Sequence, residues 1–414
     1  MRTWIIHRER NIYDFLLILM CWLIAAGEIG ASLQFVRVLI MVLIPFFISD
    51  SIQSKLRFSA PLRQVPSYRY ELGLFIIWWI YCVLSLYWAI EPESSLKGLL
   101  YMTLYFFGFG EILWLASKAR KPQQSLLIGW VIMCLTTMPI AINELLNDHH
   151  LSMSKQEADM AMKMGKNTME ARRFASVTFG NLNTYNVVLC MTFCMMMINT
   201  LRDSIKERIT GYLMIVAIVA LIAVNSSRAS LICVVFGLLV YVLVLMQKKR
   251  HVMLLLGGIV AALGILIYQY ADLFSLIIMR FQSQGLEDIG RLGVITHGLE
   301  ELARTYGFGI GMNNFIPTML QKYHLNIAAP HNLWLEVGVQ YGIVILIGYI
   351  GMYVRAYKRS KGGTKFNRFA AILSIIPFLP VTIIDSGYLY KSTTWIYLAT
   401  IYVLVQPEYN DHEV

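Results

Sequence analysis

The sequence predicts an all-α, polytopic integral membrane protein, and three observations lead to this fold class. Apolar residues make up 57% of the 414 residues, charged residues make up only 14%, and the mean hydropathy is +0.59. Soluble domains are about 45–50% apolar and about 25% charged, so a single water-soluble core is excluded. Long apolar runs recur along the whole chain, and they are apolar on every side, which favours helices over the alternating strands of a membrane barrel.

About 12 transmembrane helices are expected, because about 20 apolar residues cover the hydrocarbon layer of a bilayer. Charged or polar residues bound each run. The expected spans are residues 12–28, 31–49, 71–90, 96–115, 125–143, 183–199, 209–225, 229–246, 252–270, 333–354, 369–385 and 393–406. The whole chain, residues 1–414, is then a single membrane domain. Its first helix is expected to be retained, since no small-residue cleavage site follows it.

The distribution of charge predicts the orientation. The formal net charge is +10, from 35 Lys and Arg against 25 Asp and Glu. With the N-terminus on the inner side, every inner loop of the twelve-helix plan is basic, as the positive-inside rule expects. The basic segments are residues 2–10, 55–69, 118–121, 202–208, 248–250 and 355–368. Both termini are therefore expected in the cytoplasm, and the positive charge is explained without nucleic acid as a partner.

The six cysteines all fall inside expected spans, and the chain contains no C-x-x-C pair. Disulfides and structural zinc are therefore not expected.

Two outer segments, residues 144–182 and 271–332, are too long to be simple turns, and loops of such length in compact proteins are often functional. The second segment should contain an amphipathic helix near residues 291–305, followed by the glycine-rich turn "GFGIGMNNF". This turn lacks GK[ST] and a βαβ context, so nucleotide binding is not indicated.

Three groups in these outer layers could carry chemistry. Arg228 lies between two apolar runs, where a charge is either functional or a marker of the headgroup layer. Arg172 and Arg173 precede the sixth span, where an exposed basic pair is also ordinary. His331 opens the tenth span, followed by Asn332 and, one turn later, by Glu336, whose carboxylate could orient the ring or raise its pKa.

Two arginines and a histidine at one face suit the transfer of a group from a diphosphate. Arg stays charged and presents planar donors to phosphate oxygens, while a His of near-neutral pKa can accept a proton from an attacking sugar hydroxyl. Such a site needs no metal and no cofactor. The competing interpretation is a metal held by acidic pairs in outer loops, either Glu91 with Glu93 or Glu157 with Asp159.

Four segments resemble motifs of the bacterial O-antigen ligase and O-antigen polymerase superfamily. In chain order they are "RRFASVTFGNLNTYNVV", "NSSRAS", "GRLGVITHGLEELARTYGFGIGMNNF" and "HNLWLEVGVQYGIVILIGY". The resemblance covers residues 172–350, and the helix plan extends it over nearly the whole chain. Two departures concern Leu182, which replaces the usual Pro of "NPN", and Thr296 or His297, which stands where an aromatic is common.

Position by position, the resemblance implies that Arg173 and Arg228 engage a lipid-linked diphosphate and that His331 is the catalytic base. It also implies that Arg172 and Arg291 help to position the substrates. The motif positions with supporting, substrate-binding roles are Asn183, Asn332 and Glu336.

The expected function is therefore glycosyl transfer from an undecaprenyl-diphosphate-linked glycan donor, at the outer face of the bacterial cytoplasmic (inner) membrane. A polymerase would add the glycan to the next repeat unit, and a ligase would add it to lipid A core or another acceptor; both stay open. A lipid-linked oligosaccharide flippase is the alternative from another class, although transporters place charges near the bilayer midplane. Membrane lipid, a chain-length regulator and a flippase protein are the expected partners.

Overall fold

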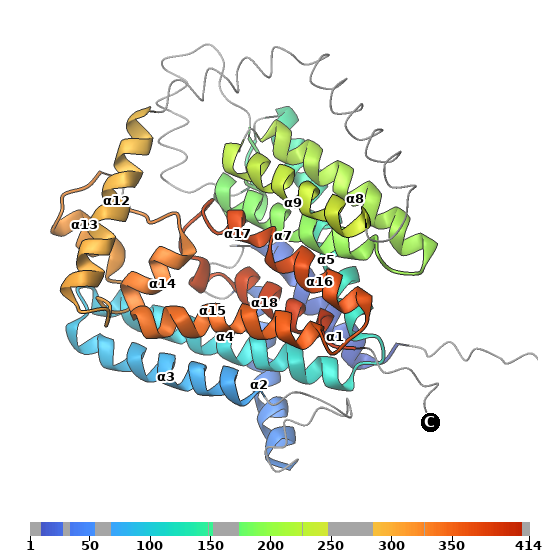
Figure 1. The fold of residues 1–414 in the computed structure, drawn as a ribbon, viewed down its shortest axis with the longest axis horizontal. Helices are drawn as coiled ribbons and strands as arrows, with labels where there is room; N and C mark the ends of the chain where they lie inside the picture. The colour runs from blue at the N-terminus through green and yellow to red at the C-terminus, as the bar shows by residue number, and fades with distance from the viewer. Residues whose placement is uncertain are drawn as a thin grey trace, which may run out of the picture.

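The computed structural model describes residues 10–27, 34–53, 68–147, 149–151, 174–225, 227–246, 285–326 and 328–407, and all regular structure in them is helical (Figure 1). The expectation of an all-α membrane protein is confirmed. Seven of the described helices are long and apolar enough to cross a membrane, and the segments Ile12–Ala26 and Ser392–Leu404 are shorter apolar helices.

The α-helices of the first half are α1 (Ile12–Trp22), α2 (Phe35–Gln53), α3 (Arg69–Ser85), α4 (Pro92–Lys118), α5 (Pro122–Asn147), α7 (Leu182–Asn199) and α8 (Ile205–Val224). Those of the second half are α9 (Arg228–Met246), α12 (Gly285–Arg304), α13 (Phe315–Gln321), α14 (Leu333–Tyr341), α15 (Ile343–Ser360), α16 (Lys365–Ile375), α17 (Phe378–Val381) and α18 (Ser392–Leu404). Single 3₁₀ turns are η1 (Leu23–Ala26), η3 (Leu86–Trp88), η4 (Val177–Phe179) and η5 (Tyr388–Tyr390).

Two expected spans are not single helices, which corrects the helix plan. Span 333–354 is divided at Gly342, whose φ is +87° and whose added Cβ would lie 2.5 Å from the Phe308 carbonyl oxygen. Span 369–385 is divided into α16 and α17 at Pro377, because proline cannot donate the backbone bond that would continue the helix. Span 252–270 lies outside the described residues.

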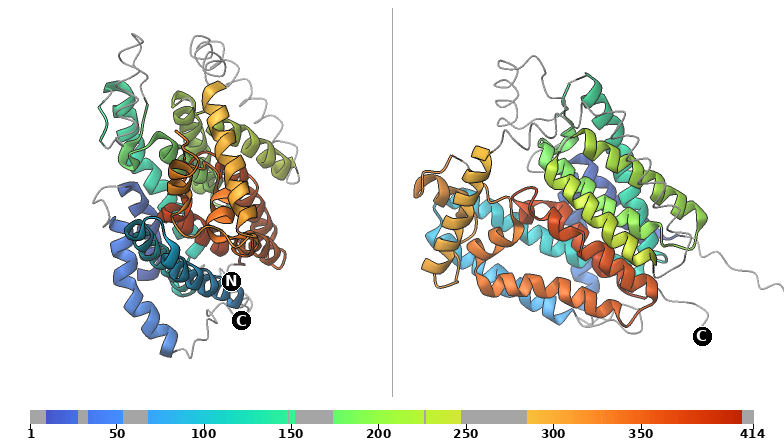
Figure 2. Two further views of the ribbon diagram at one scale, coloured as in Figure 1. Left: turned by 90° about the vertical axis from the view of Figure 1, so that its left-hand side faces the viewer. Right: turned by 45° about the horizontal axis from the view of Figure 1, so that its top comes forward.

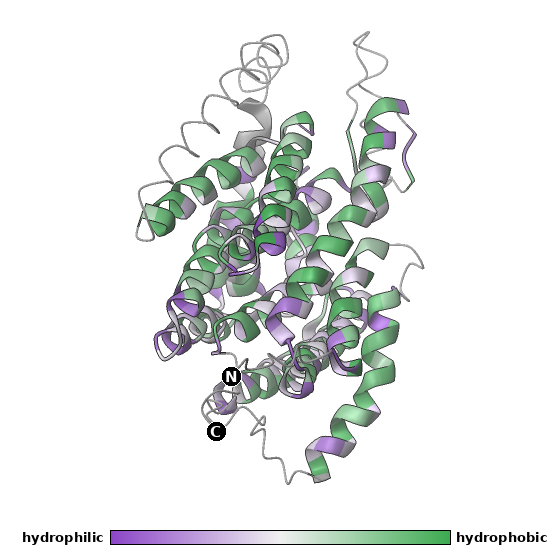
Figure 3. Ribbon diagram, turned by 90° about the vertical axis from the view of Figure 1, so that its right-hand side faces the viewer, coloured by the Kyte–Doolittle hydropathy of each residue, from purple (hydrophilic) through white to green (hydrophobic). Residues whose placement is uncertain are grey.

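The centre of the bundle is formed by α7 and α18, whose side chains are buried around the whole circumference. Helix α7 packs against α8, α9 and α16, while α18 packs against α4 and α16. The outer helices are largely hydrophobic along their length (Figure 3). They expose large apolar side chains, among them Phe46 at 62%, Val216 at 65% and Leu239 at 59%. Exposed apolar surface on this scale is what a lipid-facing helix presents, so burial and hydropathy agree on a membrane setting. All six cysteines are buried and free, as expected.

The expected inner segments meet at one end of the bundle. The Asn11 side chain donates to the Lys118 carbonyl at 2.8 Å, joining the start of α1 to the end of α4. Gln123 and Asn367 both donate to the Gln406 carbonyl, at 2.7 and 2.6 Å, and so join the starts of α5 and α16 to the end of α18. The opposite end carries α12, α13 and α14, on the left in Figure 1 and again grouped in Figure 2.

A buried ion network at the inner end holds α15 against α3. Glu71 is 1% exposed. Its carboxylate accepts from Arg355 Nε at 3.1 Å and from the Tyr402 hydroxyl at 2.9 Å. The carboxylate also lies 3.1 Å from Arg359 Nη2. Three donors on α15 and α18 thus share one carboxylate of α3.

Glu71→Ala should destabilise the protein by about 3 kcal/mol, because it leaves Arg359 buried without its counter-charge. The thermal midpoint of the detergent-purified protein measures this loss. Glu93→Ala is the matched control, since Glu93 is exposed at the start of α4. Equal midpoints for Glu71→Ala and the wild type would show that the network contributes nothing to stability.

Candidate functional site

The described segments next to the predicted arginines contact one another at the end of the bundle opposite the expected inner segments. Arg172 and Arg173 lie outside the described residues, which resume at Phe174. The next residue, Ala175, donates its N–H to Asn225 Oδ1 at 2.8 Å. The Asn225 Nδ2 group in turn donates to Asn186 Oδ1 at 3.2 Å. Arg228 begins α9 three residues after Asn225. The chain leaving the arginine pair therefore lies against the turn that leads to Arg228.

The turn after the arginine pair is held by a buried carboxylate. Glu144, near the end of α5, is 0% exposed and accepts from the backbone N–H groups of Ser176 and Val177, each at 2.8 Å. Val177 has a φ of +54°, a conformation that β-branched residues rarely adopt. The Glu144 bonds hold the backbone in this turn, so the position of the segment is determined by α5.

Helix α7 starts directly after this turn, and its cap explains the departure at Leu182. The Asn181 side chain accepts from the N–H groups of Asn183 at 2.7 Å and Thr184 at 3.3 Å. Leu182 occupies the first helical position, where proline is favoured but not required. The replacement therefore leaves the cap intact. Asn183 itself is half-buried in the first turn of α7.

His331 lies immediately before α14 in a strained backbone conformation. Its φ is +42°, a region sparsely populated by residues other than glycine. The residues that follow His331 hold this conformation. The Asn332 side chain caps α14 by accepting from Trp334 N at 3.0 Å and Leu335 N at 3.1 Å. Leu333 N donates to the Thr382 carbonyl at 2.9 Å. Strain of this kind costs about 1–3 kcal/mol and clusters at functional sites. The Asn332 side chain is thus occupied by the helix cap directly after His331.

The Nδ1 atom of the His331 ring is buried, and within the described part of the chain it has no hydrogen-bond partner. Burial of the ring lowers the pKa of His331 below its ordinary value of 6.5, and the Arg291 charge adds to this effect. Asp385 and the Ile384 backbone act in the opposite direction, and Lys391 lowers the pKa further. The net shift is downward, which favours the neutral form of the imidazole near pH 7.

Arg291 and His331, forty residues apart in sequence, are brought together by this arrangement. Arg291 is exposed on α12 and acts electrostatically on the His331 ring. Glu336, in contrast, does not take the place expected for it beside the histidine. It is 2% exposed and accepts the Gly387 N–H at 2.9 Å, which ties α14 to the turn before α18. The carboxylate that acts on the ring is Asp385.

Asp385, Lys391 and Thr184 form a polar cluster that the motifs do not point to. Lys391 Nζ pairs with Asp385 Oδ2 and donates to Thr184 Oγ1 at 3.0 Å, while Thr184 Oγ1 donates to Asp385 Oδ2 at 2.6 Å. Asp385 is only 6% exposed. The sequence signal was available, because an aspartate at the end of an apolar run is costly unless it has a partner.

Two cavities lie near segments that the sequence singled out. One, of about 470 Å³, is lined by Pro139, Ile140, Asn143, Glu144, His149 and Leu151, next to the turn that follows the arginine pair. The other, of about 390 Å³, lies between α12, α13 and η3, and includes none of the predicted site residues. Among the described residues no three His, Cys, Asp or Glu side chains converge as metal ligands. Glu91 and Glu93 are both exposed, and Glu157 and Asp159 lie outside the described residues.

The described residues form a helical bundle with exposed apolar surface, as integral membrane proteins have, and His331 lies beside the polar cluster of Asp385, Lys391 and Thr184. Residues 213–350, which contain Arg228, Arg291 and His331, match the family model described as O-Antigen ligase. The match confirms the resemblance to the O-antigen ligase and polymerase superfamily.

The chain is also similar to the teichuronic acid biosynthesis protein TuaE of Bacillus subtilis (strain 168). The two are 23% identical over 363 residues, which cover 81% of this chain and 71% of TuaE. Together the two matches support a membrane protein of polysaccharide biosynthesis with a glycan-transfer or ligase-type role.

Proposed function

We propose that the protein is a glycosyltransferase that polymerises undecaprenyl-diphosphate-linked oligosaccharide units, at the outer face of the cytoplasmic membrane, into O-antigen, capsule or exopolysaccharide. The observation that carries the proposal is the His331 ring, whose pKa is lowered and whose Nδ1 atom has no hydrogen-bond partner in the described part of the chain. Asp385 acts on this ring and bonds Thr184 in the first turn of α7, and Asn186 of the same helix bonds Asn225, three residues before Arg228. The basic inner segments and the similarity to a teichuronic acid biosynthesis protein support the orientation and the polymer product.

The proposed reaction is a displacement at the anomeric carbon of the donor. His331 Nδ1 accepts the proton of an acceptor sugar hydroxyl, whose oxygen forms the new bond to that carbon while the bond to the diphosphate oxygen breaks. The undecaprenyl diphosphate leaves with the bonding electron pair, and Arg173 and Arg228 stabilise its negative charge. The proton remains on His331 until solvent removes it.

The proposed chemistry uses arginine where many transferases use a metal ion. We therefore expect transfer by the purified protein to survive EDTA, because guanidinium groups supply the positive charge at the leaving group. A strict requirement for Mg²⁺ or Mn²⁺ would contradict this and would favour the acidic residues Glu91 and Glu93. The comparison of EDTA-treated and untreated protein in one transfer assay decides between them.

The pH dependence of transfer should carry the signature of His331. Because the pKa of His331 is lowered, its neutral form persists below pH 6.5, and the acid limb of kcat/KM should lie below that value. Lys391→Gln should move the limb to higher pH, since it removes a positive charge that lowers the pKa. Asp385→Asn should move it to lower pH, since it removes the negative charge that raises the pKa. Shifts in the same direction for both variants would refute the assignment.

The second candidate is a ligase that transfers the finished glycan to lipid A core or another acceptor, and the description of the matching family favours it. A deletion strain distinguishes the two functions by gel analysis of the glycan. Loss of long chains with single repeat units still attached to their acceptor supports the polymerase. Loss of all attached glycan supports the ligase, and unchanged glycan would overturn both.

A further inference from the structure

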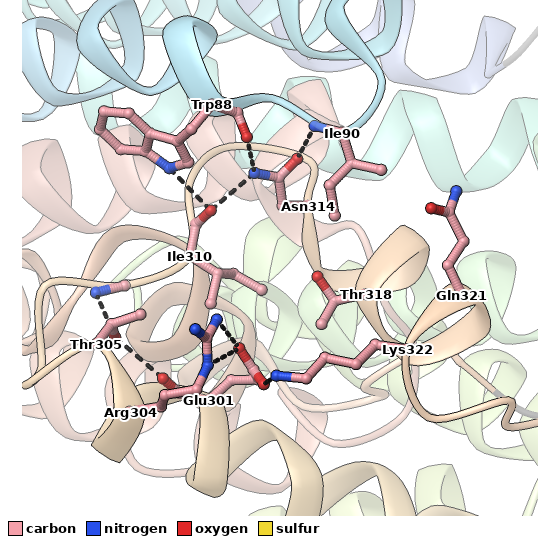
Figure 4. Close-up of a pocket in the computed structure, with 11 residues that line it drawn as sticks. Trp88, Ile90, Glu301, Arg304, Thr305, Ile310, Asn314, Thr318, Gln321 and Lys322 are labelled. Carbon is pink, nitrogen blue, oxygen red and sulfur yellow. Dashed lines mark hydrogen bonds and ion pairs between the residues drawn. The ribbon is translucent and has the colours of Figure 1, made fainter.

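The cavity of about 390 Å³ is a cleft on the outer face, separate from His331 (Figure 4). Three parts of the chain form its walls. One is the charged wall of α12 and α13, with Glu301, Arg304, Gln321 and Lys322; the second is the connection between these helices, with Ile310 and Asn314; the third is the turn after α3, with Trp88 and Ile90. Trp88 and Ile90 are 46% and 42% exposed, so they offer apolar surface beside the polar groups. A few polar groups on an apolar wall are the usual composition of a small-molecule site.

The apolar wall of the cleft is rigidly held. Trp88 Nε1 donates to the Ile310 carbonyl at 3.0 Å, and Asn314, which is 1% exposed, donates to the same carbonyl at 2.7 Å and accepts from Ile90 N at 2.9 Å. Gly311 has a φ of +99°, and an added Cβ would lie 2.6 Å from the Trp88 indole nitrogen. The indole ring is therefore fixed in place before any ligand arrives.

A fully buried carboxylate organises the charged wall. The Glu301 side chain is 0% exposed, accepts from Arg304 Nη2 at 2.6 Å, Arg304 Nε at 3.0 Å and the Tyr323 hydroxyl at 2.7 Å, and pairs with Lys322. Although burial raises the pKa of Glu301, the bonds from Arg304, Lys322 and Tyr323 lower it to about 2. Glu301 thus stays ionised, and one positive charge of the Arg304, Lys322 and Glu301 group remains in excess.

The charged groups that the cleft offers to a ligand are hydrogen-bond donors. The Ile310 carbonyl, the Asn314 side-chain oxygen and the Glu301 carboxylate all accept bonds from the protein itself. Arg304 and Lys322 are 63% and 45% exposed at the side chain, and each has N–H groups beyond those that Glu301 accepts. A ligand that bonds these two side chains must therefore bring acceptors, and a negative charge on the ligand strengthens those bonds.

Backbone bonds connect the cleft to the helix that follows His331. Ile310 N donates to the Val339 carbonyl at 2.8 Å and Gly311 N donates to the Gln340 carbonyl at 2.9 Å, near the C-terminal end of α14. His331 precedes the N-terminal end of the same nine-residue helix, roughly 13 Å away at 1.5 Å per residue. An extended ligand of a few sugar units spans that distance.

We propose that this cleft is a subsite for an anionic saccharide, in which Arg304 and Lys322 bind a carboxylate- or phosphate-bearing sugar beside the apolar surface of Trp88 and Ile90. Its use as a glycan subsite for the reaction at His331 rests on the proposed function. Binding of the acidic sugar itself does not depend on turnover.

The test is direct binding to the full-length protein in nanodiscs of zwitterionic lipid, measured by isothermal titration calorimetry. The probes are an oligogalacturonate, its neutral methyl ester and inorganic sulfate. We expect the oligogalacturonate to bind at least about tenfold more tightly than the ester, because the ester keeps the sugar but loses the charge-assisted bonds. Equal binding of acid and ester would overturn the anionic specificity, and equal binding of sulfate alone would overturn the saccharide part.

Variants locate the site. Arg304→Gln should weaken oligogalacturonate binding about tenfold, and it leaves Lys322 and Tyr323 on Glu301, so no buried charge is orphaned. Gln321→Trp should weaken binding by filling the cleft. Arg208→Gln is the matched control, because Arg208 is exposed on α8 near the inner end. Unchanged oligogalacturonate binding in both cleft variants would overturn the proposal. If the wild-type protein binds oligogalacturonate but the deletion strain shows no polymer defect, only the proposed function is refuted.

Discussion

His331→Ala should reduce glycan transfer by roughly 10²- to 10⁴-fold, which is the usual contribution of a general base. The expectation rests on the Nδ1 atom, which has no hydrogen-bond partner among the residues that the structure describes, and on the lowered pKa of the ring, which favours its neutral form. The measurement is the rate of chain extension by the purified protein with a lipid-linked donor. Long glycan chains should disappear from cells that carry the variant, while the protein still inserts in the membrane.

A second variant separates loss of the base from loss of the backbone conformation. His331→Gly relieves the positive φ at this position, so added imidazole should restore part of the activity if the ring acts as a base. His324 is a matched control, because it lies on the same outer segment with a φ of +52° and is exposed. His324→Gly should leave transfer unchanged. Full activity in His331→Ala would remove this residue from the mechanism.

The helix positions could be predicted because a helix that crosses the hydrocarbon layer needs a long apolar run in its own sequence. This requirement does not depend on which other helices pack against it. The division of two spans could not be predicted, since it depends on contacts distant in sequence. At Gly342 the backbone of Phe308 approaches too closely for any side chain, and only the folded outer segment creates that approach. In the second case Pro377 was visible, but proline inside an apolar run does not always end a helix. Pro45 and Pro139 lie within α2 and α5.

The candidate site shows the same limit. The motifs indicated His331 and Arg291, and in the structure the Arg291 charge acts on the His331 ring. The motifs also placed Glu336 beside the histidine, yet its carboxylate bonds the Gly387 turn, and Asp385 acts on the ring instead. Spacing along one helix suggested the Glu336 pairing. The Asp385 contact depends on how the turn after α17 folds back onto the start of α14, through the bond between Leu333 N and the Thr382 carbonyl.

Arg228→Ala should lower transfer by about 10²- to 10³-fold, the cost of removing a donor that stabilises charge at the leaving group. The position supports this expectation: Arg228 begins α9 directly after a turn whose Asn225 binds the segment that follows Arg173. Arg228→Lys keeps the charge but loses the planar pair of donors that matches a phosphate, so its activity should lie between those of the alanine variant and the wild type.

Substrate binding and chemistry can be separated for this residue. If Arg228 stabilises the departing diphosphate, kcat should fall more than KM rises, because the interaction strengthens as the bond to the sugar breaks. If it only marks the end of a helix at the headgroups, kcat and KM should both match those of Arg208→Ala, a variant of an exposed arginine near the opposite end. Equal kinetics in Arg228→Ala and Arg208→Ala would show that Arg228 does not bind the diphosphate. Arg291 and Lys391 would then be the next residues to test as diphosphate-binding groups.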